Sequence, residues 1–295
     1  MAEFLEALPR HAFLQYALLA GLLASLACGV VGAYVVSRRI SYLAGAMAHS
    51  VLGGLGAARY LQVTRGWEWC QPLYGALAAA LLAALAIGLV SLKARGREDT
   101  IIGAIWAVGM ALGVLFMAAT PGYGVDLMAY LFGNILMVGP VDLWLMAGLD
   151  LVVALVGLGL YPQLLAVCFD EEFARLRGLN VDLYYLLLLG LTALTVVLLS
   201  TVVGIVMVIA LLTLPAAVAA HFGRRLWQIM AGAVVLSALF TSAGLGLSYA
   251  PDLPAGACII LLAGGVYLAA TLGAWLWRRR PRAAAAPAPG GPSQG

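Results

Sequence analysis

Three ionisable side chains in or beside apolar segments of this sequence could do chemistry: His49, Asp126 and Asp150. A neutral imidazole binds zinc and other first-row metals, and carboxylates attract cations. Ionisable groups inside a membrane are costly, which makes them functional candidates by default. A single histidine cannot hold a divalent ion tightly, and a transport pathway must release what it receives. These residues are therefore candidates for a pathway through the membrane.

His49 lies in a stripe of small residues spaced four apart, with Ser41, Gly45, Gly53 and Ala57. Such a stripe either lets a neighbouring helix approach closely or leaves room for an ion. The alternative for His49 is a buried histidine that bonds a backbone carbonyl. Both interpretations of His49 remain open from the sequence.

The two carboxylates have their own alternatives. Asp126 follows Pro121-Gly122 at the edge of a short apolar segment, where it either steers cations or caps a half-helix. Asp150 falls inside a long apolar run, where a charge costs at least ~2.5 kcal/mol on insertion scales and needs a partner or water. Asp150 is a second pathway candidate.

The composition assigns the chain to the membrane. Of its 295 residues, 64% are hydrophobic and 10% are charged, where a soluble domain carries about 25% charged residues. This excludes soluble enzymes and nucleic-acid binders. Lys93 is the only lysine and follows Leu92, so no Walker A loop is present. The four cysteines are scattered and form neither a zinc motif nor a disulfide framework.

Nine apolar runs are long enough to cross about 30 Å of hydrocarbon. Because they are continuous and rich in Leu, Ala and Gly, they predict helices and an all-α polytopic fold. The runs are 13–36, 43–62, 72–92, 101–119, 143–161, 183–199, 203–220, 228–249 and 256–277.

Basic residues predict the orientation of these spans. Thirteen of the 16 fall in loops on one side, which the positive-inside rule makes cytoplasmic. The N-terminus is then outside, the C-terminus is cytoplasmic, and the chain is a multi-pass protein of the cell (cytoplasmic or inner) membrane. The thirteen are Arg38, Arg39, Lys93, Arg95, Arg97, Arg175, Arg177, Arg224, Arg225, Arg278, Arg279, Arg280 and Arg282.

The basic residues stay on one side only if the segment 120–140 does not cross the membrane. Its apolar core, 127–138, is too short to span and suits a re-entrant hairpin or half-helix on the outer side. We expect residues 1–280 to form one transmembrane permease domain. Residues 281–295 are of low complexity and predict a disordered cytoplasmic tail.

The longest cytoplasmic connection contains a short helix signal. Asp170 is a good N-cap and Gly178 can end the helix. The acidic residues suit the helix start, the basic residues suit its end, and two apolar residues share one face. Such a helix either rests on lipid headgroups or docks into a separate motor subunit. The residues between the caps include Glu171, Glu172, Phe173, Arg175 and Leu176.

Pro215 lies inside the seventh apolar run, where it removes a backbone hydrogen bond and should kink the helix. The kink is either a hinge or a static bend.

Taken in order, several segments resemble the membrane permeases of ABC importers for zinc, manganese and iron cations. Together they cover roughly residues 13 to 275. They are Arg38 to Tyr42, Ala48 to Ser50, Gly122 to Leu127, Tyr130 to Gly133, Asp170 to Ala174 before Gly178, Val203-Gly204, Leu214 to Ala217, and Asp252 to Gly256.

The resemblance implies a homodimer that works with two cytoplasmic ATPase subunits and an extracytoplasmic metal-binding protein. It also implies that residues 170–178 form the coupling helix to the ATPase. Residues 38–42 resemble the zinc branch. One departure matters: many members carry an aspartate four residues before the histidine, and here that position is Gly45.

These observations predict the transmembrane subunit of an ATP-driven importer of a divalent metal, zinc first, with manganese or iron as alternatives. We expect no catalytic residue and no bound cofactor in the subunit, since ATP is hydrolysed by the partner. One alternative is a permease for a metal chelate such as cobalamin or a siderophore. The other is a secondary transporter driven by an ion gradient, which favours intramembrane carboxylates and inverted repeats.

Overall fold

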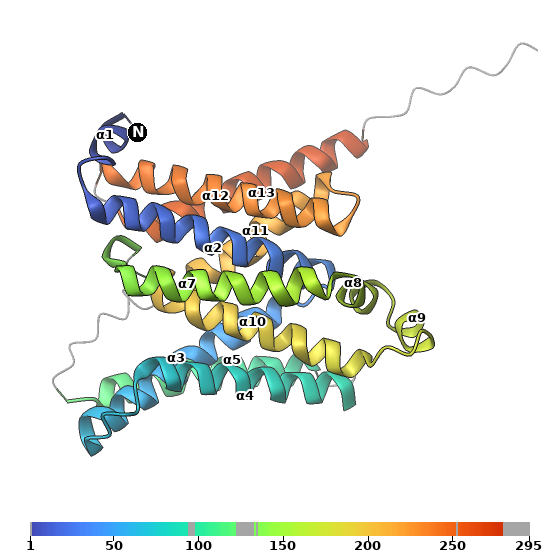
Figure 1. The fold of residues 1–295 in the computed structure, drawn as a ribbon, viewed down its shortest axis with the longest axis horizontal. Helices are drawn as coiled ribbons and strands as arrows, with labels where there is room; N and C mark the ends of the chain where they lie inside the picture. The colour runs from blue at the N-terminus through green and yellow to red at the C-terminus, as the bar shows by residue number, and fades with distance from the viewer. Residues whose placement is uncertain (1, 94–97, 122–132, 134, 252, 280–295) are drawn as a thin grey trace, which may run out of the picture.

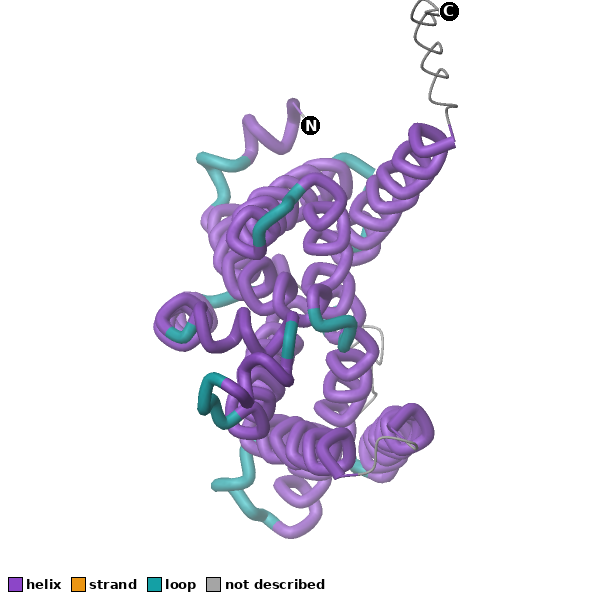
Figure 2. Tube along the Cα trace, turned by 90° about the vertical axis from the view of Figure 1, so that its right-hand side faces the viewer, coloured by secondary structure: helices purple, strands orange, loops and turns teal. Residues whose placement is uncertain are grey.

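The described part of the chain is built from helices. The computed structural model describes residues 2–93, 98–121, 133, 135–251 and 253–279. The helices lie side by side along one direction (Figure 1), and many are seen end-on when the molecule is turned (Figure 2). The predicted tail 281–295 lies outside the described residues.

The helices follow in chain order, with one short 3₁₀ helix, η1, and one π-helical stretch, η2. They are α1 (Ala2–Ala7), α2 (Ala12–Ser37), α3 (Ser41–Arg65), α4 (Pro72–Lys93), α5 (Glu98–Ala119), η1 (Ile135–Met137), α7 (Pro140–Val153), η2 (Ala154–Leu158), α8 (Tyr161–Phe169), α9 (Glu171–Leu176), α10 (Val181–Val203), α11 (Ile205–Phe222), α12 (Leu226–Tyr249) and α13 (Ala255–Arg279).

Within the described residues, eight helices are long and apolar enough to span a membrane. The remaining one of the nine predicted spans is α3, a helix of 25 residues that packs against both α4 and α5. Its glycines and polar residues lower its hydropathy, because α3 presents small side chains to its neighbours rather than large ones to lipid. The chain is an all-α, multi-pass membrane protein, as the sequence predicts.

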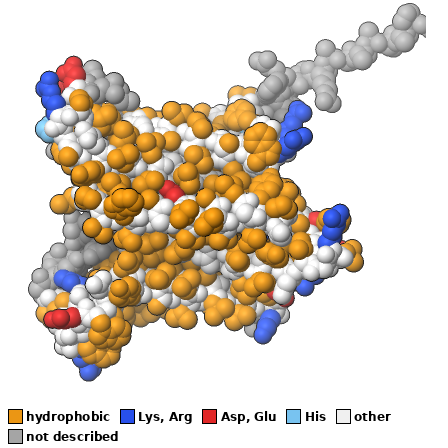
Figure 3. Space-filling view, in the orientation of Figure 1, with side chains coloured by type: hydrophobic (Ala, Val, Ile, Leu, Met, Phe, Trp, Pro, Cys, Tyr) orange, Lys and Arg blue, Asp and Glu red, His pale blue; other side chains and the backbone are white. Residues whose placement is uncertain are grey.

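Figure 3 shows how the surface fits a membrane. Hydrophobic side chains cover the flank of the bundle, and Lys and Arg side chains gather at its two ends. Exposed leucines lie along the helices rather than in one patch, for example Leu82, Leu115 and Leu261. Apolar side chains on the flank are stable in hydrocarbon, and charged groups at the ends reach water.

Successive long helices alternate in direction (Figure 1). We call the end where α2 turns into α3 the Arg38 end, and the end where α7 begins the Asp142 end. Helix α5 finishes and α7 starts at the Asp142 end, so the segment between them leaves and returns on one side. This agrees with the prediction that residues 120–140 do not cross. Residues 122–132 and 134, with Asp126, lie outside the described residues.

Helix α2 is the most buried of the candidate spans and packs against α7, α11 and α12. Its turn into α3 is short, with Arg39 in the left-handed region at φ 61°. A second tight turn consists of Gly204 alone, at φ 90°, between α10 and α11. Only glycine adopts this conformation readily, which explains why Val203-Gly204 ends one helix and begins the next.

Candidate functional site

His49 lies at the interface between α3 and α5. Its ring stacks on Trp106 of α5, with ring centroids 4.8 Å apart and planes inclined by 23°. The residue is 9% exposed, and its Nδ1 atom is buried without a hydrogen-bond partner among the described residues. Nδ1 therefore does not make the carbonyl bond that a packed core histidine would be expected to make.

Gly45 explains how the indole fits. A Cβ atom added at Gly45 would lie 2.5 Å from Cζ3 and 2.7 Å from Cη2 of Trp106. Further along the same face, a Cβ at Gly53 would lie 2.7 Å from the carbonyl oxygen of Gly109. The small-residue stripe of α3 thus serves the close approach of α5, the first of the two alternatives that the sequence leaves open.

Asp150 is buried on another helix pair. It lies in α7, which packs against α2, and it is 8% exposed. Neither carboxylate oxygen has a hydrogen-bond partner among the residues that the structure describes. His49 and Asp150 thus belong to different interfaces. Among the described residues, no three His, Cys, Asp or Glu side chains come together as a metal-binding group.

We expect Asp150→Asn to raise the apparent melting temperature of the purified protein. A buried carboxylate without a partner destabilises an apolar interface, because it must either carry a charge there or bind a proton, and the amide cannot ionise and has nearly the same size. The matched control is Asp182→Asn, which removes one half of the exposed Arg175–Asp182 pair and should change little. A fall in melting temperature for Asp150→Asn would show that the carboxylate has a stabilising partner.

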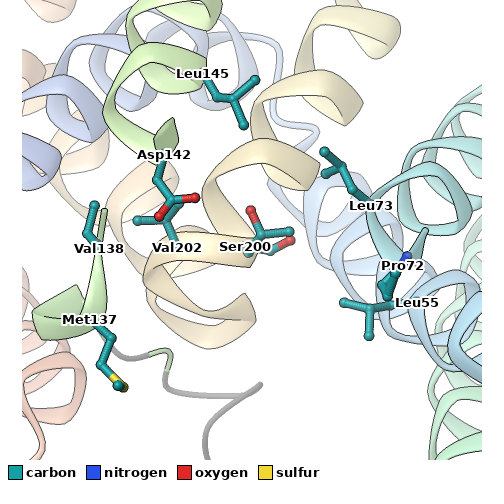
Figure 4. Close-up of a pocket in the computed structure, with 10 residues that line it drawn as sticks. Leu55, Pro72, Leu73, Met137, Val138, Asp142, Leu145, Ser200 and Val202 are labelled. Atoms are coloured by element: carbon teal, nitrogen blue, oxygen red, sulfur yellow. The ribbon is translucent and has the colours of Figure 1, made fainter. Parts of the chain in front are cut away.

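A hollow of about 450 Å³ opens at the Asp142 end, between α3, α4, η1, α7 and α10. Asp142 and Ser200 lie on one side of it and Leu55 and Pro72 on the other (Figure 4). The Asp142 carboxylate accepts a hydrogen bond from the Gly139 N–H at 2.9 Å and caps α7. Leu55 projects about 120° around α3 from His49, given 3.6 residues per turn. The hollow and the imidazole therefore face different sides of α3.

The predicted helix over 170–178 is present as α9. The Asp170 side chain accepts a hydrogen bond from the Phe173 N–H at 2.9 Å, which is the N-cap. Gly178 ends the helix at φ 78°, and the Leu179 N–H donates to the Ala174 carbonyl at 3.1 Å. Local capping therefore specifies both ends of this short helix, as the sequence indicates.

Apolar side chains of α9, and of Phe169 before its N-cap, are exposed at the Arg38 end. Leu176 is 87% exposed, and Phe169 and Phe173 are more than one-third exposed. The Arg177 guanidinium lies over the Phe173 ring, 4.9 Å from its centroid. Ala174, in contrast, is buried against Val167 and Val181. Helix α9 is thus fixed on one face and presents an apolar, charge-flanked surface on the other.

Arg38 joins four elements at this end of the bundle. It lies at the end of α2, donates to the Val167 carbonyl of α8, and pairs with the Glu171 carboxylate of α9 at 2.5 Å. Its guanidinium also lies 4.3 Å from the centroid of the Tyr185 ring of α10. Burial raises the pKa of the adjacent Cys168 thiol to about 11, although Arg38 opposes the rise. The thiol is therefore neutral near pH 7, and Glu171 is the charged partner of Arg38.

We expect Arg38→Gln to loosen α9 without unfolding the bundle. The change leaves the Val167 carbonyl and the Glu171 carboxylate without their charged donor, and such bonds contribute about 1.5–3 kcal/mol. The rate of trypsin cleavage at Arg175 and Arg177 should rise, measured by mass spectrometry. The control is Arg39→Gln, because Arg39 is exposed in the same turn. Equal cleavage rates in both variants would contradict the proposed link.

Pro215 lies inside α11, which continues on both sides of it from Ile205 to Phe222. It is buried, and α11 packs against α2, α12 and α13. Whether it acts as a hinge stays a prediction.

Two of the contacts described above carry no clear sequence signal. Trp106 is one aromatic residue in an apolar run, and only the pairing of α3 with α5 places it on His49. Arg38 stands in a motif, but its partner Glu171 lies 133 positions away in the chain. Asp142 has a partial signal, because a carboxylate three residues after glycine and two after proline suits a helix start.

Comparison with known proteins adds an independent finding. The ABC 3 transport family matches residues 10–274 of the chain. The chain is 43% identical over 268 residues to an uncharacterized membrane protein of Synechocystis, covering 91% of this chain and 93% of that protein. It is 41% identical to a probable metal transport system membrane protein of Chlamydia trachomatis, covering 85% of each. Identity is 35% to the manganese transport system membrane protein MntC of Halalkalibacterium halodurans, covering 90% and 88%.

The fold is also similar to a solved structure. PsaBC from Streptococcus pneumoniae in complex with Fab aligns with a TM-score of 0.80 and 30% identity, covering 91% of this chain and 94% of that one. The likeness therefore extends over nearly the whole bundle.

Proposed function

The chain belongs to the ABC 3 transport family, and from this premise we propose that it carries a divalent metal ion into the cell, driven by ATP hydrolysis in a separate subunit. It is a metal-transport permease and not the catalytic subunit of its transporter. The Arg38 end then faces the cytoplasm and the Asp142 end faces outward. Two copies of the chain and two ATPase subunits form the working complex, and a metal-binding protein delivers the ion.

The observation that carries this proposal is the exposed apolar surface of α9. Leu176 is 87% exposed although it lies at a water-facing end of the molecule. Exposed apolar side chains flanked by charges are typical of protein-binding sites. Asp170 and Gly178 fix the helix ends, and Arg38 ties α9 to α2 through Glu171. Movement of a docked ATPase would therefore be passed directly to a transmembrane helix.

Zinc is the first candidate for the carried metal. At the interface of α3 with α5, the donor that the described residues offer is the His49 imidazole, and position 45 supplies no carboxylate. Imidazole without carboxylate suits zinc better than manganese, which prefers oxygen ligands. Manganese is the second candidate, because relatives at 35% identity are named manganese transport proteins.

The test uses the complete transporter. The complex is purified through a tag on this chain, reconstituted into liposomes with its metal-binding protein, and assayed for accumulation of radioactive zinc and manganese. We expect ATP-dependent zinc accumulation that exceeds that of manganese. Accumulation driven by a proton or sodium gradient without ATP would overturn the proposal, as would ATP-dependent uptake of cobalamin without uptake of either metal.

We expect His49→Ala to lower the initial rate of metal uptake by at least about tenfold, by analogy with losses at metal sites. The ATPase should still co-purify, because His49 lies in α3, whereas α9 packs against α8 and α10. The matched control is His221→Ala, whose exposed ring bonds the Ala217 carbonyl within its own helix. Uptake unchanged in His49→Ala would remove His49 from the pathway, while the transporter assignment itself would stand or fall on the wild-type assay.

A further inference from the structure

The stacked pair of His49 and Trp106 suggests a role for the indole. A metal bound to a histidine is held along the ring plane, by a lone pair on one nitrogen. The other nitrogen usually donates a hydrogen bond to a carboxylate or carbonyl, and this bond fixes the orientation of the ring. Nδ1 of His49 is buried and has no such partner in the part of the chain that the structure describes. Something other than a hydrogen bond through Nδ1 must therefore set the plane of this ring.

The indole has the geometry to do so. Its ring lies 4.8 Å from the imidazole centroid and is inclined by 23°, so it covers one face of the imidazole. Stacking of this kind restrains rotation of the imidazole plane. It does not occupy the in-plane directions along which the nitrogen lone pairs point. The contact therefore orients the ring and leaves it able to bind.

The backbone around Trp106 fixes the indole in turn. A Cβ atom at Gly45 would approach the indole to 2.5 Å, so the indole fills the space in which any side chain at position 45 would lie. Helix α5 is held close to α3 by further glycine contacts. A Cβ at Gly56 would lie 2.9 Å from the Gly113 carbonyl oxygen. A side chain at 45 therefore fits only if the indole at 106 moves.

We propose that Trp106 is a positioning residue for His49, which holds the imidazole in the orientation that meets the passing metal and replaces a carboxylate at position 45. The inference rests on the proposed function, since it assumes that His49 contacts the transported ion. It assigns no metal contact to Trp106 itself.

The test is a set of four variants in the reconstituted transporter: Trp106→Ala, Trp106→Phe, Gly45→Asp, and the double variant Gly45→Asp with Trp106→Ala. We expect Trp106→Ala to lower zinc uptake about tenfold, the lower end of losses for residues that orient a metal ligand. Trp106→Phe should keep at least about one-third of the wild-type rate, because a smaller ring still stacks. Gly45→Asp alone should not support zinc uptake, because its carboxylate meets the indole.

The double variant gives the sharpest readout. Removal of the indole makes room for the introduced carboxylate at position 45, which then lies one helical turn from His49 and reaches Nδ1. We expect uptake to recover at least about threefold over Trp106→Ala, with a coupling of the size seen for residues in contact. Trp144→Ala is the matched control, because this tryptophan of α7 is 79% exposed and should tolerate the change.

Each result is compared with assembly and melting temperature of the purified complex. Wild-type uptake in Trp106→Ala, together with loss in His49→Ala, would overturn the inference and leave the proposed function intact. Equal loss in Trp106→Ala, Trp106→Phe and the double variant would show that Trp106 only fills space, which also overturns it. If Trp106→Ala does not assemble, zinc uptake by the double variant is compared with uptake by Gly45→Asp. Uptake by the double variant that does not exceed uptake by Gly45→Asp counts against the inference.

Discussion

Replacement of both Phe173 and Leu176 by aspartate is expected to separate the permease from its ATPase and to stop transport. Both side chains are apolar and exposed on α9, and Leu176 is 87% exposed. An apolar side chain at the centre of an interface contributes about 2 kcal/mol or more, roughly a 30-fold change in affinity. Two such losses, with two added charges, should leave less than about one-tenth of the ATPase on a tagged permease.

The permease itself should remain folded in this variant, because neither side chain belongs to the buried part of the bundle. Monodispersity in detergent and an unchanged melting temperature would check this. The matched control is Leu253→Asp, an exposed leucine at the opposite end, between α12 and α13. Full ATPase retention by the Phe173 and Leu176 double variant would contradict docking through α9, and the helix would then be assigned to the lipid headgroups.

The two acidic residues at the start of α9 differ in their contacts. The sequence places Glu171 and Glu172 together at the helix start, but Glu171 is paired with Arg38 inside the chain. A lysine at 171 would break that pair as well as change the docking surface. Glu172 is exposed, so Glu172→Lys tests the electrostatic part of docking alone. We expect it to weaken ATPase binding less than the apolar double variant does, because charges at the rim of an interface contribute little.

Local signals allow much of the fold to be predicted. Continuous apolar runs predict nine spans, and the structure extends most of their ends because helices continue beyond the hydrocarbon until a cap stops them. Helix α3, expected over 43–62, runs from Ser41 to Arg65 and ends at Gly66, which adopts φ 67°. Helix α9 is predictable from Asp170 and Gly178 for the same reason, since caps depend on residues a few positions apart.

Helix α8 shows where local signals are weaker. The sequence predicts residues 161–169 as part of a connection, yet they form a helix with Pro162 in its first turn. A proline is suited to a helix start. The nine residues of α8 are too few for a stable helix alone, so it depends on Leu164 and Val167 packing against the bundle. Such dependence on tertiary contact cannot be predicted from a short segment.

The candidate site is predictable only in part. His49 and Asp150 stand out because ionisable residues are rare in apolar runs, but nothing local indicates that they belong to different helix pairs. The stack of Trp106 on His49 joins residues of two different helices. Contacts of this kind depend on which helices pack together, and that is set by the fit of whole faces rather than by neighbouring residues.

The fit of α3 against α4 is the place where the smallest change should have the largest effect on folding. A Cβ atom at Gly54 would lie 2.1 Å from the Gly75 carbonyl oxygen and 2.5 Å from the Ala79 Cβ atom. A Cβ at Gly75 would in turn lie 2.3 Å from the Gly54 carbonyl oxygen. These partners are largely backbone atoms, which cannot rotate away as a flexible side chain can.

We therefore expect Gly54→Val to abolish recovery of folded permease and Gly54→Ala to lower its melting temperature markedly. Overpacking in a core costs about 1–3 kcal/mol, and contact with backbone on both helices places Gly54→Val above that range. The measurement is the yield of monodisperse protein in detergent and its thermal unfolding. The matched controls are Gly265→Ala and Gly265→Val, because a Cβ on this α13 glycine meets nothing within 4 Å.

Alanine at 265 should be neutral or stabilising, since alanine exceeds glycine in helix propensity by about 1 kcal/mol. Replacement of glycine by alanine is thus expected to lower the melting temperature at position 54 and to leave it unchanged or raise it at position 265. A normal yield of Gly54→Val would show that α3 and α4 can separate without loss of the fold. The support of the His49 helix would then have to come from α5 alone, through the glycine contacts that also hold Trp106 in place.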